Sequence, residues 1–517
     1  MVGIELNEQF KKALEVLEHT CQNVFITGKA GTGKSTLLTY FREKTAKKLV
    51  VLAPTGVAAL NVGGETIHSF FKFKPNITRD KIKRLKSKKS AVYKALEMIV
   101  IDEVSMVRSD LLDCVDAFLR LNGSQPGKPF GGVQMIFIGD LYQLPPVVMG
   151  QERDIFKTHY KSPYFFSAHV FGDIDMEFIE LEKIYRQKDE IFISLLNSIR
   201  NNTIGDEGLR LLNLRLGAEL PADKGQDFAL HLTTTNAAAS GVNEERLSRL
   251  ATKPKVYRAR VSGEFSEKYY PTEYDLCLTA GAQVMLLNND QQGRWVNGSI
   301  GKIKEIRRSR EAGEDTIIVE LFGGKAVEVA RFTWEIFHFT WDEEAQAITT
   351  EEAGSFCQYP IRLAWAITIH KSQGKTFDRV IIDMSAGAFA HGQTYVALSR
   401  CRTLEGMSLK TPIKKSHIFS DWRIVEFMTK YQYRLSERDL PLDEKIAVIE
   451  RAIAAGKELE ITYLKADDEK SRRVIRPCQV GEMVYCDKPF LGVSAYCLKR
   501  KEERVFRVDR ILEMKPV

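Results

Sequence analysis

The sequence contains no long apolar run, no Cys-x-x-Cys pair, no internal repeat and no low-complexity tract. Because its apolar runs stay below the roughly 18 residues that a membrane-spanning helix needs, we expect no membrane protein. The eight cysteines are scattered, which argues against a zinc site and against a disulfide framework. Residues 1–16 have the pattern of an amphipathic helix rather than of a secretion signal. These absences predict a reduced protein of the cytoplasm.

The positive charge of the chain is concentrated in one short stretch. The 517 residues, enough for about three or four domains, carry a net charge of only +7. Residues 72–90 (KFKPNITRDKIKRLKSKKS) hold nine Lys or Arg and one Asp, a local charge of +8, which leaves −1 for the rest. Such a stretch is either a solvated helix face or loop, or a contact for the phosphate backbone of a nucleic acid. Charge alone leaves both interpretations open.

Residues 28–36 (GKAGTGKST) fit the phosphate-loop pattern and follow a strand-like run at residues 24–27. Glycines let backbone N–H groups approach phosphates closely. Lys34 is expected to bind the β- and γ-phosphates of ATP, and the Ser35 hydroxyl to ligate Mg²⁺. The alternative is a chance glycine turn that caps an ordinary helix. The loop residues predicted to bind ATP are Gly28, Ala30, Gly31, Thr32, Gly33, Lys34, Ser35 and Thr36.

A second strand-like run, residues 98–101, ends in two adjacent carboxylates, Asp102 and Glu103. Asp102 is predicted to complete the Mg²⁺ site with Ser35. Glu103 is then left beside the γ-phosphate as the candidate base that orients a water. The acidic pair makes the chance-turn alternative much weaker, and the chain is predicted to hydrolyse ATP with Mg²⁺ as cofactor.

Strand-like and helical segments alternate twice along the chain. The first alternation has strand-like runs at residues 24–27, 48–52, 98–101, 134–138 and 177–181, which predicts a parallel sheet of the α/β class. Because the polar residues of interest follow these strands, we expect one crevice at their carboxyl ends. The second alternation has strands at 231–234 and 379–383 and helices at 361–370 and 394–400.

Two further segments interrupt or follow this pattern. Residues 253–359 form a β-rich, turn-rich block that is predicted to be a small barrel inserted into the second α/β domain. Residues 436–444 (SERDLPLDE) have the polar, Pro-containing composition of a linker. A terminal module of about 75 residues is expected beyond it.

Six segments resemble, in order, the motifs of superfamily 1 helicases. They are residues 53–71 (APTGVAALNVGGETIHSFF), 102–116 (DEVSMVRSDLLDCVD), 139–147 (GDLYQLPPV), 181–187 (LEKIYRQ), 366–383 (AITIHKSQGKTFDRVIID) and 395–401 (YVALSRC). The resemblance covers about residues 6–415 and is strongest to the PIF (petite integration frequency) family of superfamily 1B, which is related to the RecD-type helicases.

The resemblance implies two tandem RecA-like P-loop domains with an inserted Src-homology-3-like barrel. Domain 1A would span residues 1–181, with a small insertion 1B near 72–95. Domain 2A would comprise residues 182–252 and 360–435, and the inserted barrel 2B residues 253–359.

Further residues of the ATP site are implied by the resemblance and supported by their chemistry. Gln143 follows a strand end, where its amide can hydrogen-bond the γ-phosphate; the alternative is a polar loop residue. Arg186 and Arg400 would be arginine fingers of the second domain, and surface salt bridges are the alternative. Gln9 resembles the glutamine that recognises adenine, although one glutamine on an amphipathic helix is more often solvent-facing. Gly374 and Lys375 are implied where the second domain meets the nucleotide.

The resemblance also implies a track for single-stranded DNA. Hydroxyls and backbone amides suit phosphates, and aromatic faces suit bases of any sequence. Phe70 and Phe71 can equally be core residues, and the Asn297-Gly298 pair is more simply a hairpin turn. The positions that resemble DNA contacts are Thr55, Gly56, His68, Phe70, Phe71, Thr234, Asn236, Asn297, His370 and Ser372.

The terminal module, residues 442–517, resembles a WYL domain. The similarity lies in residues 459–477 (LEITYLKADDEKSRRVIRP) and 503–511 (ERVFRVDRI), and Pro489-Phe490-Leu491 replaces the eponymous tripeptide. The fold is therefore better supported than ligand binding. The residues implied on the ligand face are Tyr463, Arg473, Arg476, Arg504, Arg507 and Arg510.

The function implied is an ATP-dependent helicase that translocates 5′ to 3′ on single-stranded DNA and unwinds duplexes during repair, replication or recombination. We expect a monomer, nucleoid-associated if the source is bacterial. Duplex junctions, G-quadruplexes and RNA–DNA hybrids are open as substrates. A clamp loader or protein remodeller would leave residues 370–374 (HKSQG) and 396–400 (VALSR) unexplained. A non-enzymatic regulator would need a helix-turn-helix, and the sequence shows none.

Overall fold

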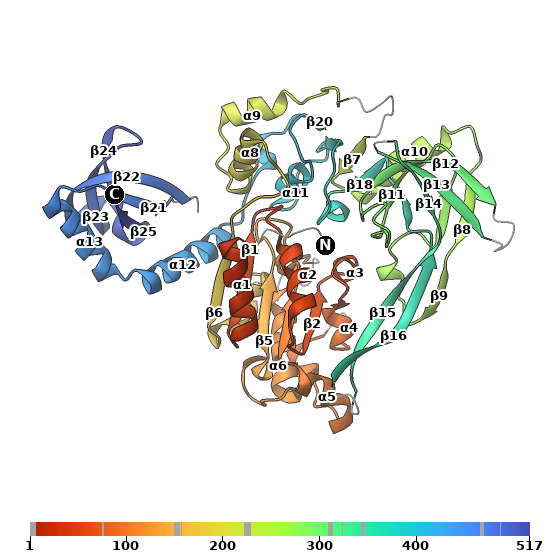
Figure 1. Cartoon of the computed structure of the whole chain (residues 1–517), viewed down its shortest axis with the longest axis horizontal. Coiled ribbons are helices and arrows are strands. Elements are labelled where there is room, and N and C mark those ends of the chain that lie inside the picture. The colour runs from red at the N-terminus through yellow and green to blue at the C-terminus, as the bar shows by residue number, and fades with distance from the viewer. Residues whose placement is uncertain are drawn as a thin grey trace. The chain divides into compact units, whose positions relative to one another are not determined.

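The chain divides into two compact units. The computed structural model describes residues 7–74, 77–148, 156, 158–221, 229–308, 314–322, 324–342, 347–465, 470–485 and 488–517. The large unit is Met1–Ile199 with Ile204–Phe419, and the C-terminal unit is Arg200–Thr203 with Ser420–Val517 (Figure 1). Within these described ranges, no helix is long and apolar enough to cross a membrane. Residues 75–76 of the basic stretch and 466–469 of the terminal motif lie outside the described residues.

The first part of the large unit is a six-stranded parallel sheet. Its strands are β1 (Asn23–Gly28), β2 (Leu49–Ala53), β3 (Glu65–Thr66), β4 (Met98–Ile101), β5 (Gln134–Ile138) and β6 (Met176–Leu181), in the order β3-β2-β4-β5-β1-β6. All neighbours are parallel, which confirms the five predicted strands. β3 was not predicted, because a run of two residues carries no recognisable pattern.

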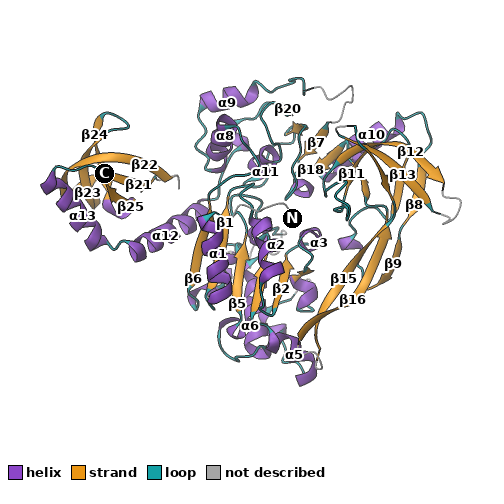
Figure 2. Ribbon diagram, viewed as in Figure 1, coloured by secondary structure: helices purple, strands orange, loops and turns teal. Residues whose placement is uncertain are grey.

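Helices pack on this sheet and form the first core. They are α1 (Glu8–His19), α2 (Lys34–Lys44), α3 (Gly56–Asn61), α4 (Ile67–Phe70), α5 (Ser87–Ala95) and α6 (Ser109–Asn122) (Figure 2). Asn7 caps α1 by accepting a hydrogen bond from the Phe10 amide at 2.8 Å. The buried faces of α1 and α2 meet the strand residues Val24, Ile26 and Val100. The predicted amphipathic helix near the amino terminus is thus confirmed.

The second α/β part of the large unit contains a four-stranded parallel sheet. Its strands are β18 (Ala366–Thr368), β7 (Leu230–Thr233), β19 (Val380–Asp383) and β20 (Met407–Leu409), in that order. The helices of this part are α8 (Glu190–Arg200), α9 (Asp206–Asn213), α10 (Asn236–Ser248) and α11 (Gln393–Ser399). The strands predicted at 231–234 and 379–383 and the helix at 394–400 are confirmed.

The helix predicted at residues 361–370 is wrong. This segment forms β17 (Ile361–Leu363) and β18, followed by a short 3₁₀ turn at His370–Ser372. A short apolar run cannot be assigned to helix or strand by periodicity alone. Here Ile361 pairs with Leu286 and Ile367 pairs with Leu232, so strand partners distant in sequence decide the conformation.

The insert between these parts is rich in β-strands, as predicted, and these strands pair antiparallel. A five-stranded sheet has the order β14-β13-β12-β11-β17, beside a pair β10-β8 and a three-stranded sheet β15-β16-β9. The strands are β8 (Lys255–Arg258), β9 (Arg260–Gly263), β10 (Asp275–Leu278), β11 (Gln283–Leu286), β12 (Ile300–Arg308), β13 (Asp315–Leu321), β14 (Ala326–Val329), β15 (Phe332–Asp342) and β16 (Ala347–Gln358). The long β15–β16 hairpin reaches α4 and α5 (Figure 1).

The C-terminal unit combines two helices with a five-stranded antiparallel sheet. The helices are α12 (Trp422–Asp439) and α13 (Leu442–Ala455), and the sheet order is β24-β23-β22-β21-β25. The strands are β21 (Leu459–Leu464), β22 (Lys470–Tyr485), β23 (Lys488–Cys497), β24 (Glu502–Arg507) and β25 (Ile511–Pro516).

The linker predicted at residues 436–444 is wrong, because most of it is helical. Only Leu440 and Pro441 separate α12 from α13. Ser436 donates to the carbonyl of Leu512 at 2.9 Å, and the buried Lys445 ammonium donates to Ser436 at 2.7 Å. α12 therefore packs with the C-terminal sheet, whereas the sequence placed most of it in the second α/β domain.

Candidate functional site

The phosphate loop bends tightly between β1 and α2. Gly31 and Gly33 have φ of +85° and +86°, in the left-handed region that favours glycine. A Cβ on Gly28 would lie 2.5 Å from the Leu181 carbonyl oxygen, so a larger residue cannot occupy this position. The Lys34 ammonium donates to the carbonyls of Gly28 at 2.7 Å and Lys29 at 3.1 Å. The loop thus has the close backbone approach and the cation that phosphates need.

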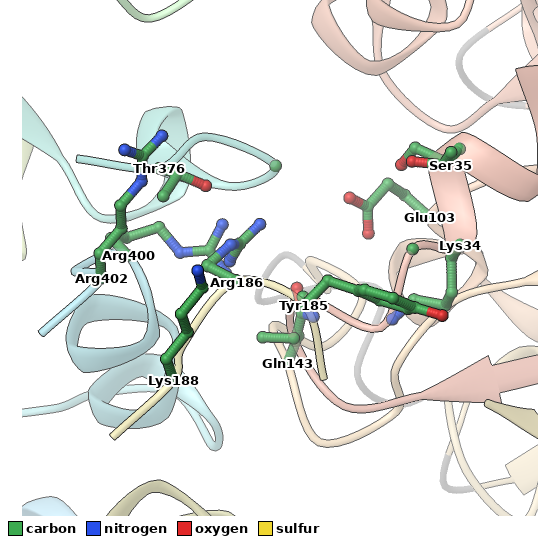
Figure 3. A pocket seen from close by; sticks show the side chains of 15 residues that line it. Lys34, Ser35, Glu103, Gln143, Tyr185, Arg186, Lys188, Thr376, Arg400 and Arg402 are labelled. Carbon is green, nitrogen blue, oxygen red and sulfur yellow. The ribbon is translucent and has the colours of Figure 1, made fainter. Parts of the chain in front are cut away.

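A cavity of about 550 Å³ lies over this loop and between the two α/β parts. Lys34, Ser35 and Glu103 lie on one side of it, and Arg186, Thr376, Arg400 and Arg402 on the other (Figure 3). The lining residues are Ala30, Gly31, Gly33, Lys34, Ser35, Thr36, Glu103, Gln143, Tyr185, Arg186, Lys188, Gly374, Thr376, Arg400 and Arg402. Most of the residues predicted for the ATP site therefore meet around one cavity. Tyr185, Lys188, Thr376 and Arg402 were not predicted.

The acidic pair lies at the carboxyl end of β4. Asp102 is 7% exposed, and burial together with the neighbouring Glu103 raises its pKa to about 7. Burial also raises the pKa of Glu103, against the charges of Lys34 and Arg400. Glu103 has φ +50°, an uncommon value for a non-glycine residue. Because both carboxyl groups have little contact with water, a positive charge placed nearby would stabilise their ionised forms.

The donors near the phosphate loop fit Mg²⁺. The cation prefers oxygen ligands and keeps several waters and substrate phosphates, so one hydroxyl and one carboxylate suffice. The Ser35 side chain lines the cavity, and Asp102 is a buried carboxyl group at the end of β4 whose ionised form a divalent cation would stabilise. No cluster of three or more His, Cys, Asp or Glu that could hold a metal occurs in the described part of the chain.

Arg186 and Arg400 are held by backbone and hydroxyl oxygens. Arg400 is 1% exposed and donates to the carbonyls of Val396 at 2.9 Å and Lys375 at 3.1 Å. Arg186 donates to the Ser399 carbonyl at 3.2 Å. Burial and the charge of Arg186 lower the pKa of Arg400 to about 9. The Arg400 guanidinium, buried in the cavity wall, is well placed to bind a phosphate. Because it is buried, it cannot form the surface salt bridge that was the alternative.

Gln373 connects the two α/β parts across the cavity. Its Nε2 donates to Glu103 Oε2 at 3.0 Å and to Gln143 Oε1 at 3.4 Å. Gln143 follows β5, as predicted, and lines the cavity. Gln373 lies inside the HKSQG motif, but no role was predicted for it, because its partners Glu103 and Gln143 are more than 200 residues away in the sequence. It holds the candidate base and the candidate γ-phosphate sensor together.

Replacing Gln373 is expected to slow hydrolysis more than it weakens nucleotide binding. Gln373→Ala removes two hydrogen bonds, each worth about 0.5–1.5 kcal/mol or more where a charge is involved. We expect the maximal ATPase rate to fall about tenfold, while the Kd for a fluorescent ATP analogue changes less than threefold. The control is Gln292→Ala, because Gln292 is exposed, whereas Gln393 is buried and therefore unsuitable. An unchanged maximal rate in Gln373→Ala would refute this role.

Five residues predicted for the ATP site do not line the cavity: Gln9, Gly28, Thr32, Asp102 and Lys375. Thr32 is buried in the loop, and Gln9 accepts a hydrogen bond from the Glu182 amide at 2.9 Å. Lys375 Nζ lies 2.5 Å from Asn297 Oδ1, on the insert. Asn297 in turn donates to Asn61 at 3.1 Å. Lys375 and Asn297 therefore form a junction of α3, the insert and the second α/β part.

The junction predicts a pH-dependent stability. Burial lowers the pKa of Lys375 from 10.5 to about 8. Between these values the unfolded chain binds more protons than the folded one, so the burial cost is present below about pH 8 and disappears as pH rises. We expect the difference in Tm between Lys375→Met and the parent, taken as variant minus parent, to decrease as the pH is raised from about 7 to about 9.5. The exposed Lys302→Met is the control, and a pH-independent difference would contradict the prediction.

Several predicted DNA contacts lie at the carboxyl ends of parallel strands. Thr55 follows β2 and caps α3 through the Ala58 amide at 3.2 Å. Gly56 lies under Tyr269, since a Cβ there would come within 2.4 Å of the ring.

Thr234 follows β7 and is 4% exposed, and Asn236 begins α10. His370 and Ser372 follow β18, and the Ser372 hydroxyl is buried against the Ile369 carbonyl at 2.7 Å. His68 is half-buried in α4.

The prediction that Phe70 and Phe71 stack on bases is corrected. They are 3% and 2% exposed, and their rings lie 5.3 Å and 6.0 Å from that of Tyr93. Phe118 joins the same cluster. With both rings enclosed by aromatic neighbours, they are core residues under the basic stretch. All nine cations of residues 72–90 are exposed.

The C-terminal unit has a basic cavity of about 400 Å³. Of the predicted ligand face, Tyr463, Arg473, Arg504 and Arg510 line it, as do Lys465, Arg500, Val505 and Phe506. Arg473 Nη1 is buried without a hydrogen-bond partner among the described residues. Arg476 pairs with Glu458 at 2.7 Å and Arg507 with Asp509 at 2.7 Å, outside the cavity lining. Lys465, inside the WYL-like segment 459–477, and Arg500, between the two WYL-like segments, were not predicted.

Comparison with known proteins agrees with this geometry. The PIF1-like helicase family model matches residues 3–208, and the WYL domain model matches residues 444–516. The ATP-dependent DNA helicase Pif1 of Bdellovibrio bacteriovorus is 32% identical over 440 residues, which cover 83% of this chain and 93% of the relative.

Two solved structures of a Bacteroides Pif1 are also similar. The complex with ADP-AlF4 has a TM-score of 0.74 and 38% identity, with 83% of this chain and 98% of that chain covered. The complex with single-stranded DNA has a TM-score of 0.61 and 37% identity, with 85% and 97% covered. The order of the motifs, the two parallel sheets around one cavity and these similarities lead to one conclusion: the chain belongs to the PIF1-like helicase family.

Proposed function

We propose that the protein is an ATP-dependent DNA helicase that translocates 5′ to 3′ along single-stranded DNA and unwinds the duplex ahead of it. The observation that carries the proposal is the composite cavity, where Lys34 and Glu103 face Arg186 and Arg400 from separate α/β parts. A site assembled from two domains couples hydrolysis to their relative motion. The similarity to a Pif1 that binds single-stranded DNA supports DNA as the substrate.

In this proposal each group has a defined task. The loop amides and Lys34 hold the phosphates, and Glu103 accepts a hydrogen bond from the attacking water. Mg²⁺ held by Ser35 and Asp102 would neutralise phosphate charge. Arg186 and Arg400 stabilise the charge that develops in the transition state, and Gln143 responds to the γ-phosphate. Gln9, Gly374 and Lys375 stay predicted contacts of the nucleotide.

The DNA is proposed to cross both α/β parts on the side of their strand ends. Thr55 and Gly56 would hold it on the first part, and Thr234, Asn236 and His370 on the second. His68, Asn297 and Ser372 stay predicted contacts as well. The predicted ranges of 1A and 2B stay part of the proposal, whereas the predicted 2A range, which ends at residue 435, is too long because the large unit ends at Phe419. Closure of the cavity on ATP would move one set of contacts toward the other.

The experiment that tests the proposal is ATP hydrolysis with and without single-stranded DNA. We expect oligonucleotides to raise the hydrolysis rate at least tenfold, with a weaker effect of blunt duplex. A rate that no DNA changes, but that a protein partner stimulates, would instead favour a clamp loader or remodeller. G-quadruplexes and RNA–DNA hybrids are proposed as further substrates, and action as a monomer is testable by sedimentation with DNA.

The C-terminal unit is proposed to bind nucleic acid or a nucleotide and so modulate the motor. Its basic cavity and the Nη1 of Arg473, which has no hydrogen-bond partner in the part of the chain that the structure describes, support an anionic ligand. We expect the pair Arg473→Ala and Arg504→Ala to weaken binding of single-stranded DNA about tenfold and to lower the salt slope by about 1.4, as two lost phosphate contacts predict. Arg507→Ala, outside the cavity lining, is the control, and equal effects of both would refute the proposal.

A further inference from the structure

Phe389 lies on the loop between β19 and α11 and is 61% exposed. Single exposed apolar residues are ordinary on protein surfaces, so exposure alone means little. The ring is not isolated, however. It lies parallel to the imidazole of His370, with the ring centroids 6.0 Å apart and an angle of 10° between the planes. The phenyl ring and the imidazole thus form an aromatic pair with nearly parallel planes.

The position of this pair follows from the sheet order. His370 follows β18, Thr234 follows β7, and Phe389 follows β19, and these three strands are neighbours in the parallel sheet. Loops at the carboxyl ends of adjacent parallel strands meet at one edge, where open α/β sheets bind their ligands. Phe389 therefore belongs to the same edge as the predicted DNA contacts of the second α/β part.

The loop that carries Phe389 is held in place on both sides. The Phe389 amide donates to Gln393 Oε1 at 3.0 Å, and His391 Nε2 lies 3.0 Å from the Leu141 carbonyl oxygen. A Cβ on Gly392 would come within 2.4 Å of the carbonyls of Tyr142 and Gln143, so the loop packs directly on the segment of the γ-phosphate sensor. An exposed ring on an anchored loop presents a fixed surface.

We propose that Phe389, paired with His370, is a stacking platform for a nucleobase of the single-stranded DNA. This inference rests on the proposed function. A flat ring of this kind takes any base, because every base has a π-face, and it needs no hydrogen bonds to the base edge. Burial lowers the pKa of His370, which favours the neutral imidazole beside Phe389.

Phe389→Ala is expected to raise the Kd for a short oligonucleotide by about 5- to 150-fold, the range for loss of one stacked base. Phe389→Trp is expected to bind within about threefold of the parent, whereas Phe389→Leu, of similar bulk without a π-face, is expected to resemble alanine. Hydrolysis of ATP without DNA is expected to stay unchanged, since the side chain lies outside the cavity lining and its truncation opens no core.

A scan of abasic sites through the oligonucleotide locates the base. In the parent, an abasic site at one position is expected to raise the Kd by about the same factor as Phe389→Ala does. In Phe389→Ala, an abasic site at that position is expected to leave the Kd unchanged. Equal losses in both proteins at every position, or unchanged affinity of Phe389→Ala, would overturn the stacking platform. If DNA does not stimulate the parent ATPase at all, the proposed function fails instead, which keeps the two outcomes distinct.

Discussion

Arg400→Ala is expected to lower the rate of ATP hydrolysis at saturating single-stranded DNA by about 10³- to 10⁵-fold, as loss of an arginine finger does. The guanidinium is 1% exposed and lines the cavity opposite Lys34 and Glu103. Its hydrogen bonds to the carbonyls of Val396 and Lys375 fix its direction before ATP arrives. Such preorganised charge stabilises a transition state without reorganisation at the moment of reaction.

Because Arg400 is buried, its truncation can also disturb folding, and a second variant separates the two effects. Arg400→Lys keeps the charge but loses the planar fork of donors, so a large loss of rate is expected with a near-parental Tm. Arg402→Ala is the matched control: Arg402 lines the same cavity, but its side chain is 59% exposed and pairs with Asp378 at 3.0 Å. Rates of Arg400→Ala and Arg400→Lys within tenfold of the parent would contradict the arginine-finger role.

Glu103→Gln is expected to reduce hydrolysis by about 10²- to 10⁴-fold, the usual contribution of a positioned general base, while ATP binding is retained. The substitution preserves size but removes the charge that orients the water. It also leaves the amide of Gln373 facing another amide, since Gln373 Nε2 donates to Glu103 at 3.0 Å. Steady-state hydrolysis and equilibrium binding of an ATP analogue measure the two effects separately.

The control for this variant lies at the opposite end of the same strand. Glu97 precedes β4, is exposed, and accepts a hydrogen bond from the Lys48 amide at 2.8 Å. Glu97→Gln changes the same chemical group far from the cavity and is expected to hydrolyse ATP at the parental rate. If Glu103→Gln matches Glu97→Gln, Glu103 is not the base.

The parts of the structure that could be predicted from the sequence are those determined by local chemistry. Buried runs such as residues 98–101, glycines at tight turns and charged residues at strand ends each carry a local signal, so the sheets and most of the ATP site were predictable. The motif order placed Arg186 and Arg400 on the second α/β part, and the structure brings both to the cavity.

What could not be predicted depends on partners distant in sequence. Strand pairing of Ile367 with Leu232 decides the conformation of a run that was expected to be helical. The enclosure of Phe70 and Phe71 depends on Tyr93 and Phe118, which no motif connects to them. Gln373 gains its role only when Glu103, 270 residues away, lies within hydrogen-bond distance. Likewise, α12 joins the C-terminal unit through Ser436 and the β25 backbone.

Single-turnover unwinding of duplexes with equal 5′ or 3′ single-stranded tails tests the central claim most directly. The protein is mixed with ATP and a trap strand, and Glu103→Gln serves as the hydrolysis-deficient control. We predict rapid strand separation of the 5′-tailed duplex by the parent, little of the 3′-tailed or blunt duplex, and none by Glu103→Gln. Unwinding of the 5′-tailed duplex by Glu103→Gln at the parental rate, or a preference for the 3′ tail, would contradict the account.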